Sequence, residues 1–152
     1  MTETIRLNAR QYEDLLKLVY LGNFVVNNFR SNRPVSRFDD LESYLFALAK
    51  DYGLAQALDM DAETGVVYPS QEFSQAEELN EYLDDFLDNS FWDEIVQRLT
   101  SRDLYRKHGQ ESVEAMSWEE IRDIEEPIRR KYASEIEKHG LENLEIVNRK
   151  AS

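Results

Sequence analysis

The sequence contains no cysteine. This absence excludes a disulfide framework, a thiol nucleophile and a zinc site with cysteine ligands. Glycine is scarce as well: five glycines are scattered along the 152 residues, and no glycine-rich loop of the kind that binds phosphate occurs. The G-x-S-x-G motif of serine hydrolases is also missing. We therefore predict no catalytic residues, no metal ligands and no cofactor from motifs.

Long hydrophobic runs are absent too. The most apolar stretch runs from Leu15 to Phe29, includes Lys17 and three asparagines, and is too short to span a bilayer. The first six residues have an acid at position 3 and lack the apolar core of a signal peptide. We expect a soluble, cytoplasmic protein without membrane contact.

Lysine and arginine are missing from one long segment of the chain. Residues 51–97 contain 13 acidic residues and no base, whereas residues 1–50 and 98–152 are each within one charge of neutral. The segment therefore accounts for the whole net charge of −13. Because a charge of this sign repels nucleic acid and anionic membranes, we expect neither as a partner.

Signals for helix starts recur along the chain. Each signal is a serine or asparagine that can cap a helix, followed three residues later by an acid or amide. The pairs are Asn8 with Gln11, Ser36 with Asp39, Ser74 with Glu77, Ser90 with Asp93, and Ser117 with Glu120. Apolar residues follow each pair at spacings of three and four, which is typical of amphipathic helices. Between the second and third helices, residues 59–72 are predicted to form a connection with a short extended piece at residues 66–68.

The fold class predicted from this pattern is all-α: about five amphipathic helices in a single bundle. The last helix keeps its apolar register across Pro127, so we predict one helix kinked at that proline. Residues 1–148 are expected to form a single domain, and residues 149–152 a frayed end.

The first helix is apolar around most of its circumference between Leu15 and Phe29. A helix of this kind is buried on more than one side. Two interpretations stay open: the helix lies at the centre of a monomeric bundle, or it forms the seam of a homodimer.

Six acids are predicted to share one face of the third helix. The opposite face is expected to pack in the core through an apolar stripe of Leu79, Tyr82, Leu83, Phe86 and Leu87. These acids are Glu77, Glu78, Glu81, Asp84, Asp85 and Asp88. One interpretation is a solvated face, and the other is a docking face for a basic protein partner. A third, cation binding, is weak, because the loop beginning at Asp59 has Thr64 where a calcium loop needs glycine and Ser70 where it needs glutamate.

Other candidates for chemistry are sparse. Both histidines, His108 and His139, precede a glycine at a predicted helix end, where capping is the expected role. Arg98, Arg102 and Arg106 share a face and are expected to pair with the acidic helix of the same or a neighbouring molecule. Acid pairs spaced by three occur at 78 and 81, 111 and 114, and 120 and 123, and bear a faint similarity to the magnesium-binding pairs of all-α nucleotide pyrophosphohydrolases.

The function predicted from the sequence is that of a small acidic interaction or regulatory protein, which docks a basic partner through residues 51–97. One alternative is an enzyme resembling the magnesium-dependent nucleotide pyrophosphohydrolases. Another is an acidic inhibitor or antitoxin-like protein that masks a basic surface.

Overall fold

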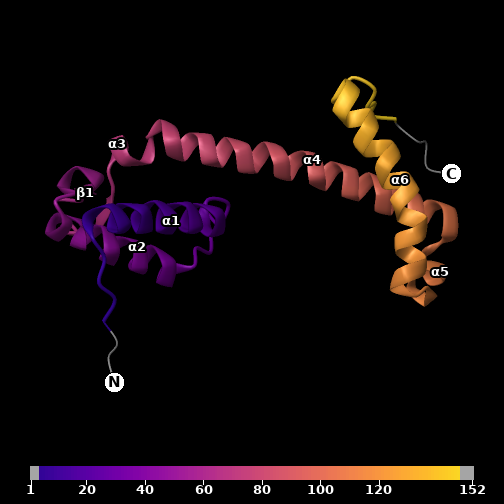
Figure 1. Ribbon diagram of the computed structural model, residues 1–152. Helices are drawn as coiled ribbons and strands as arrows, with labels where there is room; N and C mark the ends of the chain where they lie inside the picture. The colour runs from indigo at the N-terminus through magenta and orange to yellow at the C-terminus, as the bar shows by residue number, and fades with distance from the viewer. Residues whose placement is uncertain (1–3, 148–152) are drawn as a thin grey trace. The chain divides into compact units, whose positions relative to one another are not determined.

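The computed structural model describes residues 4–147 and is mostly helical, with 72% helix (Figure 1). Its elements are α1 (Ala9–Asn27), α2 (Ser36–Leu48), η1 (Ala49–Tyr52), η2 (Ala55–Ala57), β1 (Leu58–Met60), β2 (Val67–Pro69), α3 (Gln71–Ser74), α4 (Glu77–His108), α5 (Gln110–Ala115) and α6 (Trp118–His139). The all-α class predicted from the sequence is confirmed. In the described part of the chain, every helix is too short or too polar to cross a membrane.

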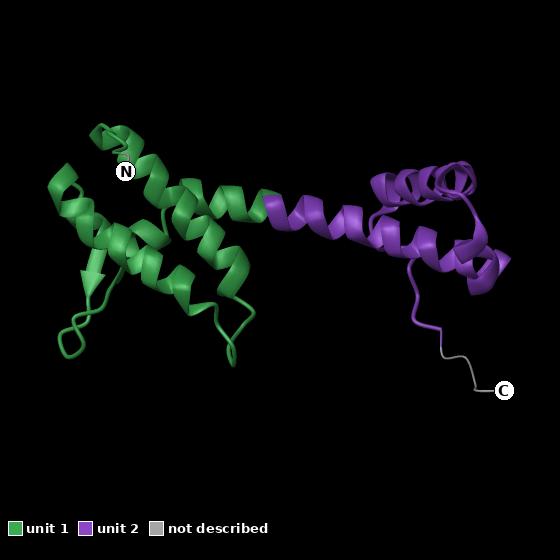
Figure 2. Ribbon diagram, turned by 90° about the horizontal axis from the view of Figure 1, so that it is seen from below, with its two compact units in different colours: residues 1–85 green, residues 86–152 purple. Residues whose placement is uncertain are grey.

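The chain divides into two compact units, one ending at Asp85 and the other beginning at Phe86 (Figure 2). The boundary falls inside α4, which is continuous from Glu77 to His108. The single domain and the single bundle that the sequence predicted stay predictions. The frayed end predicted at residues 149–152 lies outside the described residues.

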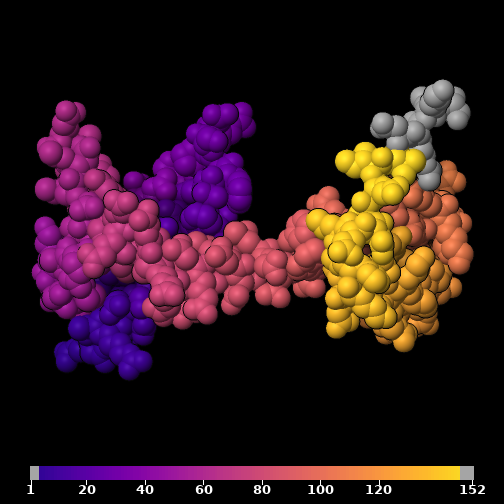
Figure 3. Space-filling view, turned by 90° about the horizontal axis from the view of Figure 1, so that it is seen from above, coloured from indigo at the N-terminus to yellow at the C-terminus, as the bar shows by residue number. Residues whose placement is uncertain are grey.

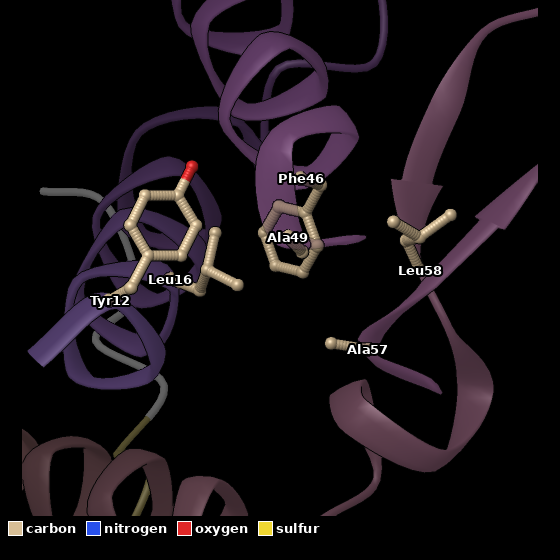
Figure 4. Close-up of a cluster of buried hydrophobic side chains, with 6 residues drawn as sticks. All are labelled: Tyr12, Leu16, Phe46, Ala49, Ala57 and Leu58. Carbon is tan, nitrogen blue, oxygen red and sulfur yellow. The ribbon is translucent and has the colours of Figure 1, made fainter. Parts of the chain in front are cut away.

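The core of the first unit is a cluster of six buried hydrophobic residues between α1, the end of α2 and the β1–β2 hairpin. Figure 4 shows their side chains gathered in one place: Tyr12, Leu16, Phe46, Ala49, Ala57 and Leu58. Phe46 is fully buried and meets the ring of Phe73 edge-on, with ring centroids 5.0 Å apart. The Tyr12 ring stacks on Tyr52, and its hydroxyl donates to the carbonyl of Leu45 at 2.8 Å.

Local signals predicted the starts of the first and last helices correctly. Asn8 and Gln11 form the predicted capping box of α1, with hydrogen bonds of 2.9 and 3.0 Å. Ser117 and Glu120 form the corresponding box of α6. The predicted extended piece at residues 66–68 overlaps β2 at Val67 and Tyr68, and β2 pairs with β1 in an antiparallel hairpin.

The middle of the chain differs from the prediction. Ser36 is the first residue of α2 rather than its cap. Ser74 ends the short helix α3, which Ser70 caps through Phe73 N–H at 3.1 Å. Ser90 does not start a helix, because α4 passes through it without a break. No proline or glycine lies between Glu77 and His108, so the weak helix formers around Ser90 do not interrupt the ladder of backbone bonds.

In the second unit, a polar cluster of Arg102, Asp103 and Tyr132 joins α4 to α6. Val96 and Leu104 are buried on α4 and Val113 on α5, and the Thr100 hydroxyl donates to the Val96 carbonyl at 2.8 Å. α6 includes Pro127, which confirms that the helix continues across the proline. The kink predicted there stays a prediction.

Gly22 lies inside α1, although neither backbone strain nor packing among the described residues requires glycine there. A Cβ atom built on Gly22 meets no atom of residues 4–147 within 4 Å, its neighbours and its own helix backbone aside. Gly22→Ala is therefore expected to raise the free energy of unfolding by about 0.5–1 kcal/mol, because alanine restricts the unfolded chain and favours helix. Urea unfolding of a dilute sample, followed by circular dichroism, measures this change. A loss of stability would mean that the space beside Gly22 is occupied.

Candidate interaction surface

The six acids predicted to share a face occupy the first twelve residues of α4. We call Glu77, Glu78, Glu81, Asp84, Asp85 and Asp88 the acidic face. All six side chains are exposed. Asp88 belongs to the second unit and the other five to the first. The structure therefore places them on one helix, as the spacing predicted, and in contact with solvent.

Glu78 is the member of the acidic face that is tied to the rest of the first unit. Its carboxylate accepts a hydrogen bond from Lys17 Nζ at 2.7 Å and another from the Tyr82 hydroxyl at 2.9 Å. Lys17 also pairs with Glu13 at 3.2 Å. The bond from Lys17, reinforced by Tyr82, lowers the pKa of Glu78 below its usual value. Glu78 thus joins the start of α4 to α1, a structural role that the sequence did not predict.

Asp88 has a partner on its own helix. Its carboxylate accepts a hydrogen bond from the indole nitrogen of Trp92, one turn further along α4, at 3.1 Å. Because the indole N–H carries no charge, this hydrogen bond does not form an ion pair. The carboxylate can therefore still contribute to the field of the acidic face.

Glu77, Glu81 and Asp84 are the acids with the least intramolecular neutralisation. No ion pair joins them to a base among residues 4–147. Together with Asp85, Gln75 and Asn80 they line a shallow hollow. In Figure 3 the first turns of α4 form part of the outer surface of the first unit. These carboxylates are available to a partner.

The apolar stripe predicted behind the acidic face is not a buried stripe. Leu79 is fully buried, but Tyr82 is 49%, Phe86 53% and Leu87 47% exposed. The helical spacing was correct, whereas the inferred burial of these three side chains was wrong. Burial depends on whether another element covers that part of the helix, which spacing alone does not determine. Of these exposed rings, Tyr82 borders the acidic face and donates to Glu78, whereas Phe86 lies on the opposite side of the helix.

The arginines predicted to pair with the acidic helix pair locally instead. Arg98 Nε contacts Glu94 at 2.6 Å, and Arg102 Nε contacts Asp103 at 2.9 Å. Arg106 lies 3.8 Å from the same aspartate. Glu94 belongs to the acidic segment, so the prediction holds for Arg98 in part. Within the described part of a single chain, the six acids of the acidic face are not among the partners of these arginines, and pairing with a neighbouring molecule stays a prediction.

Asp61, in the loop that is similar to a calcium loop, organises the turn of the β1–β2 hairpin. Its Oδ1 accepts from the backbone N–H groups of Glu63 at 3.0 Å and Thr64 at 2.7 Å, and from the Thr64 hydroxyl at 2.8 Å. The bonds from Thr64 lower the pKa of Asp61. Gly65 follows with φ at +71°, a conformation that favours glycine. Within residues 4–147, no group of three or more potential metal ligands occurs.

In each acid pair spaced by three, at least one carboxylate has a hydrogen-bond partner within the chain. Glu78 is bound to Lys17, Glu114 accepts from Gln110 at 2.7 Å, and Glu120 caps α6 through Ser117. The glycines after the two histidines have positive φ, +78° at Gly109 and +56° at Gly140. Their ψ angles of 154° and −125° lie outside the left-handed helical region, so the left-handed cap expected after each histidine is not formed.

Comparison of the chain with protein-family models, curated proteins and solved structures finds no match.

Proposed function

We propose that the acidic face is a docking surface for a basic protein partner, and that this chain is a small interaction or regulatory protein. The observation that carries the proposal is the exposed cluster of Glu77, Glu81 and Asp84, which no base among the described residues neutralises. Exposed Tyr82, at the edge of the acidic face, adds apolar contact area.

The helix itself gains little from most of this charge. Glu77 and Glu78 lie in the first turn of α4, where the helix dipole stabilises acids. Glu81, Asp84 and Asp88 lie beyond that turn and are spaced by three and four, so they repel one another along the helix surface. A cluster that slightly destabilises its own helix is better explained by a partner than by folding.

A basic partner would be attracted over a distance comparable to the Debye length, about 8 Å at physiological ionic strength. The main expected effect is a faster association that weakens as salt is added. The partner class includes basic enzymes whose surface this chain would mask, as an acidic inhibitor or antitoxin-like protein does. A soluble, cytoplasmic setting is part of the same proposal.

Charge reversal on the acidic face tests the proposal. Glu81→Lys combined with Asp84→Lys is expected to weaken capture of the basic partner about tenfold, because both attraction and encounter rate fall. The measurement is a pull-down from the native host lysate at low salt, with elution by a salt gradient, followed by affinity measurement on the purified partner.

A matched variant separates the face from the total charge. Glu142→Lys with Glu145→Lys makes the same change in net charge at two exposed positions of the second unit. It is expected to leave affinity within about twofold of the wild type, because salt screens exposed charges that lie outside an interface. Equal affinity for all three proteins would assign the acidic face to solvation alone.

The homodimer predicted through α1 is a second proposal, and a separate observation favours it. Leu18 is 68% and Val25 53% exposed on α1, and Phe29, just past the end of the helix, is 81% exposed. The described residues of the first unit therefore leave this apolar surface uncovered. No specific observation favours the enzyme alternative.

A further inference from the structure

The first unit has an apolar groove between α1 and α2, which lie side by side in Figure 1. A cavity of about 260 Å³ is lined by Val19, Gly22, Asn23 and Val26 from α1, and by Phe38 and Leu41 from α2. The exposed side chains of Leu18, Val25 and Phe29 continue the apolar surface along α1. Exposed apolar surface of this extent is typical of an interaction site.

The two walls of the groove are held together by a polar network. Asn23 and Asn27 both donate to Asp39 Oδ1, at 3.0 and 2.9 Å. Asn27 Oδ1 also accepts from the backbone N–H of Val35 at 2.8 Å. Because these bonds join α1 to α2 and the loop between them, the groove is present before any partner binds.

Charge is absent from this part of α1. No acid or base lies between Lys17 and Arg30, in a chain in which 32% of residues are charged. A basic partner of the kind proposed for the acidic face would find no counter-charge here. An uncharged apolar surface fits another uncharged apolar surface, and a second copy of α1 supplies one.

The apolar positions of α1 are arranged symmetrically about Gly22. Counted in both directions from Gly22, apolar residues of α1 stand three and four positions away: Val19 and Val25, Leu18 and Val26. At 3.6 residues per turn they fall within a sector of roughly 120° centred on Gly22. A two-fold dimer requires a self-complementary patch, and this stripe has that property.

One pair of side chains favours the antiparallel arrangement. An antiparallel crossing places Leu18 of each copy opposite Val26 of the other, a large side chain against a small one, as good packing requires. Val19 then lies opposite Val25. Gly22 at the crossing lets the two backbones approach closely, which accounts for a helical glycine whose side-chain position is empty among the described residues.

We infer that α1 pairs with α1 of a second copy in an antiparallel, two-fold crossing centred on Gly22. This inference rests on the proposed homodimer and adds its geometry. A single helix pair is at the small end of the range for stable interfaces, so the expected dissociation constant is on the order of micromolar.

The existence of the dimer is tested by sedimentation equilibrium of the full chain between about 1 and 200 μM, a range that brackets the expected dissociation constant. Val25→Asp introduces a charge on the exposed stripe and is expected to give a folded monomer. Ile5→Asp, at a position 83% exposed and outside α1, is the matched control and is expected to dimerise as the wild type does. Added salt is expected to leave the dimer intact or strengthen it, since each copy carries a net charge of −13.

The absence of native cysteine allows the geometry to be tested by oxidative cross-linking of introduced cysteines. Leu18→Cys and Val26→Cys chains are expected to form a disulfide when mixed. Neither is expected to cross-link to itself, because equal positions lie about 12 Å apart along the antiparallel axes, beyond disulfide reach.

The outcomes separate the geometry from the homodimer itself. Self-linking of both single variants would indicate a parallel pair, which overturns the inference and leaves the homodimer standing. A dimer that survives Val25→Asp, or that gives no mixed cross-link, places the interface elsewhere and also overturns it. A monomeric mass at all concentrations overturns both the inference and the homodimer. None of these results bears on the acidic face, which is tested through its basic partner.

Discussion

Phe46→Ala is expected to destabilise the first unit by about 3–5 kcal/mol, the usual range for a buried phenylalanine. The side chain is fully buried, and its ring packs edge-on against Phe73 at 5.0 Å. Its removal leaves a cavity between Leu16 and Leu58. The surrounding helices and hairpin cannot collapse to fill it, because each is held by its own backbone hydrogen bonds.

The measurement is urea unfolding followed by circular dichroism, since both tryptophans, Trp92 and Trp118, belong to the second unit and do not report on the first. Tyr44→Ala on the same helix is the control. Tyr44 is 62% exposed, so its loss is expected to change stability by no more than about 0.5 kcal/mol. A loss below about 1 kcal/mol for Phe46→Ala would mean that the cluster is not the unit's principal core.

Tyr132→Phe is expected to destabilise the second unit by about 1–2 kcal/mol, because it removes two hydrogen bonds with charged partners at a partly exposed site. The Tyr132 hydroxyl on α6 donates to Asp103 on α4. It also accepts from Arg102 at 2.9 Å. Among the described residues, this cluster is a direct polar link between α4 and α6.

The same cluster predicts a pH dependence. Hydrogen bonds from Arg102 and then from Tyr132 hold the pKa of Asp103 below its usual value. A carboxylate with a depressed folded-state pKa contributes stability that is present above its unfolded pKa, about 3.9 for aspartate, and lost as pH falls through the folded value. The difference between wild type and Tyr132→Phe is therefore expected to be full at neutral pH and to shrink below about pH 4.

Urea unfolding followed by tryptophan fluorescence, at neutral and acidic pH, measures this difference in the second unit. Tyr105→Phe is the matched control on α4, where the ring is 46% exposed. It is expected to change stability by no more than about 0.5 kcal/mol at either pH. A Tyr132→Phe effect that is constant down to acidic pH would show that Asp103 does not depend on the hydroxyl.

Much of the candidate surface followed from helical periodicity. The spacing of Glu77, Glu81 and Asp84 put them on one side of a helix, and the structure has them there, exposed. The ion pair between Glu78 and Lys17 could not be predicted, since the two residues are 61 positions apart and meet only when α4 reaches α1. The exposure of Tyr82 and Phe86 was not predicted for the same reason. Helical periodicity shows which residues share a face, but not whether another element covers that face.

The sequence by itself determined part of what depends on neighbours within about one turn of chain, although the signals at Ser36, Ser74 and Ser90 do not form helix caps. The capping boxes at Asn8 and Ser117 and the helical class are of this kind. Their hydrogen bonds and steric limits involve residues three or four positions apart.

Only the tertiary structure decided which apolar residues are buried and that the chain forms two units. Each of these depends on contacts between segments distant in sequence. Leu79 and Phe86 have similar local patterns, yet one is fully buried and the other 53% exposed. The physical reason is that the hydrophobic effect acts on the surface removed from water, which is set by the assembled elements and not by the residue or its helix.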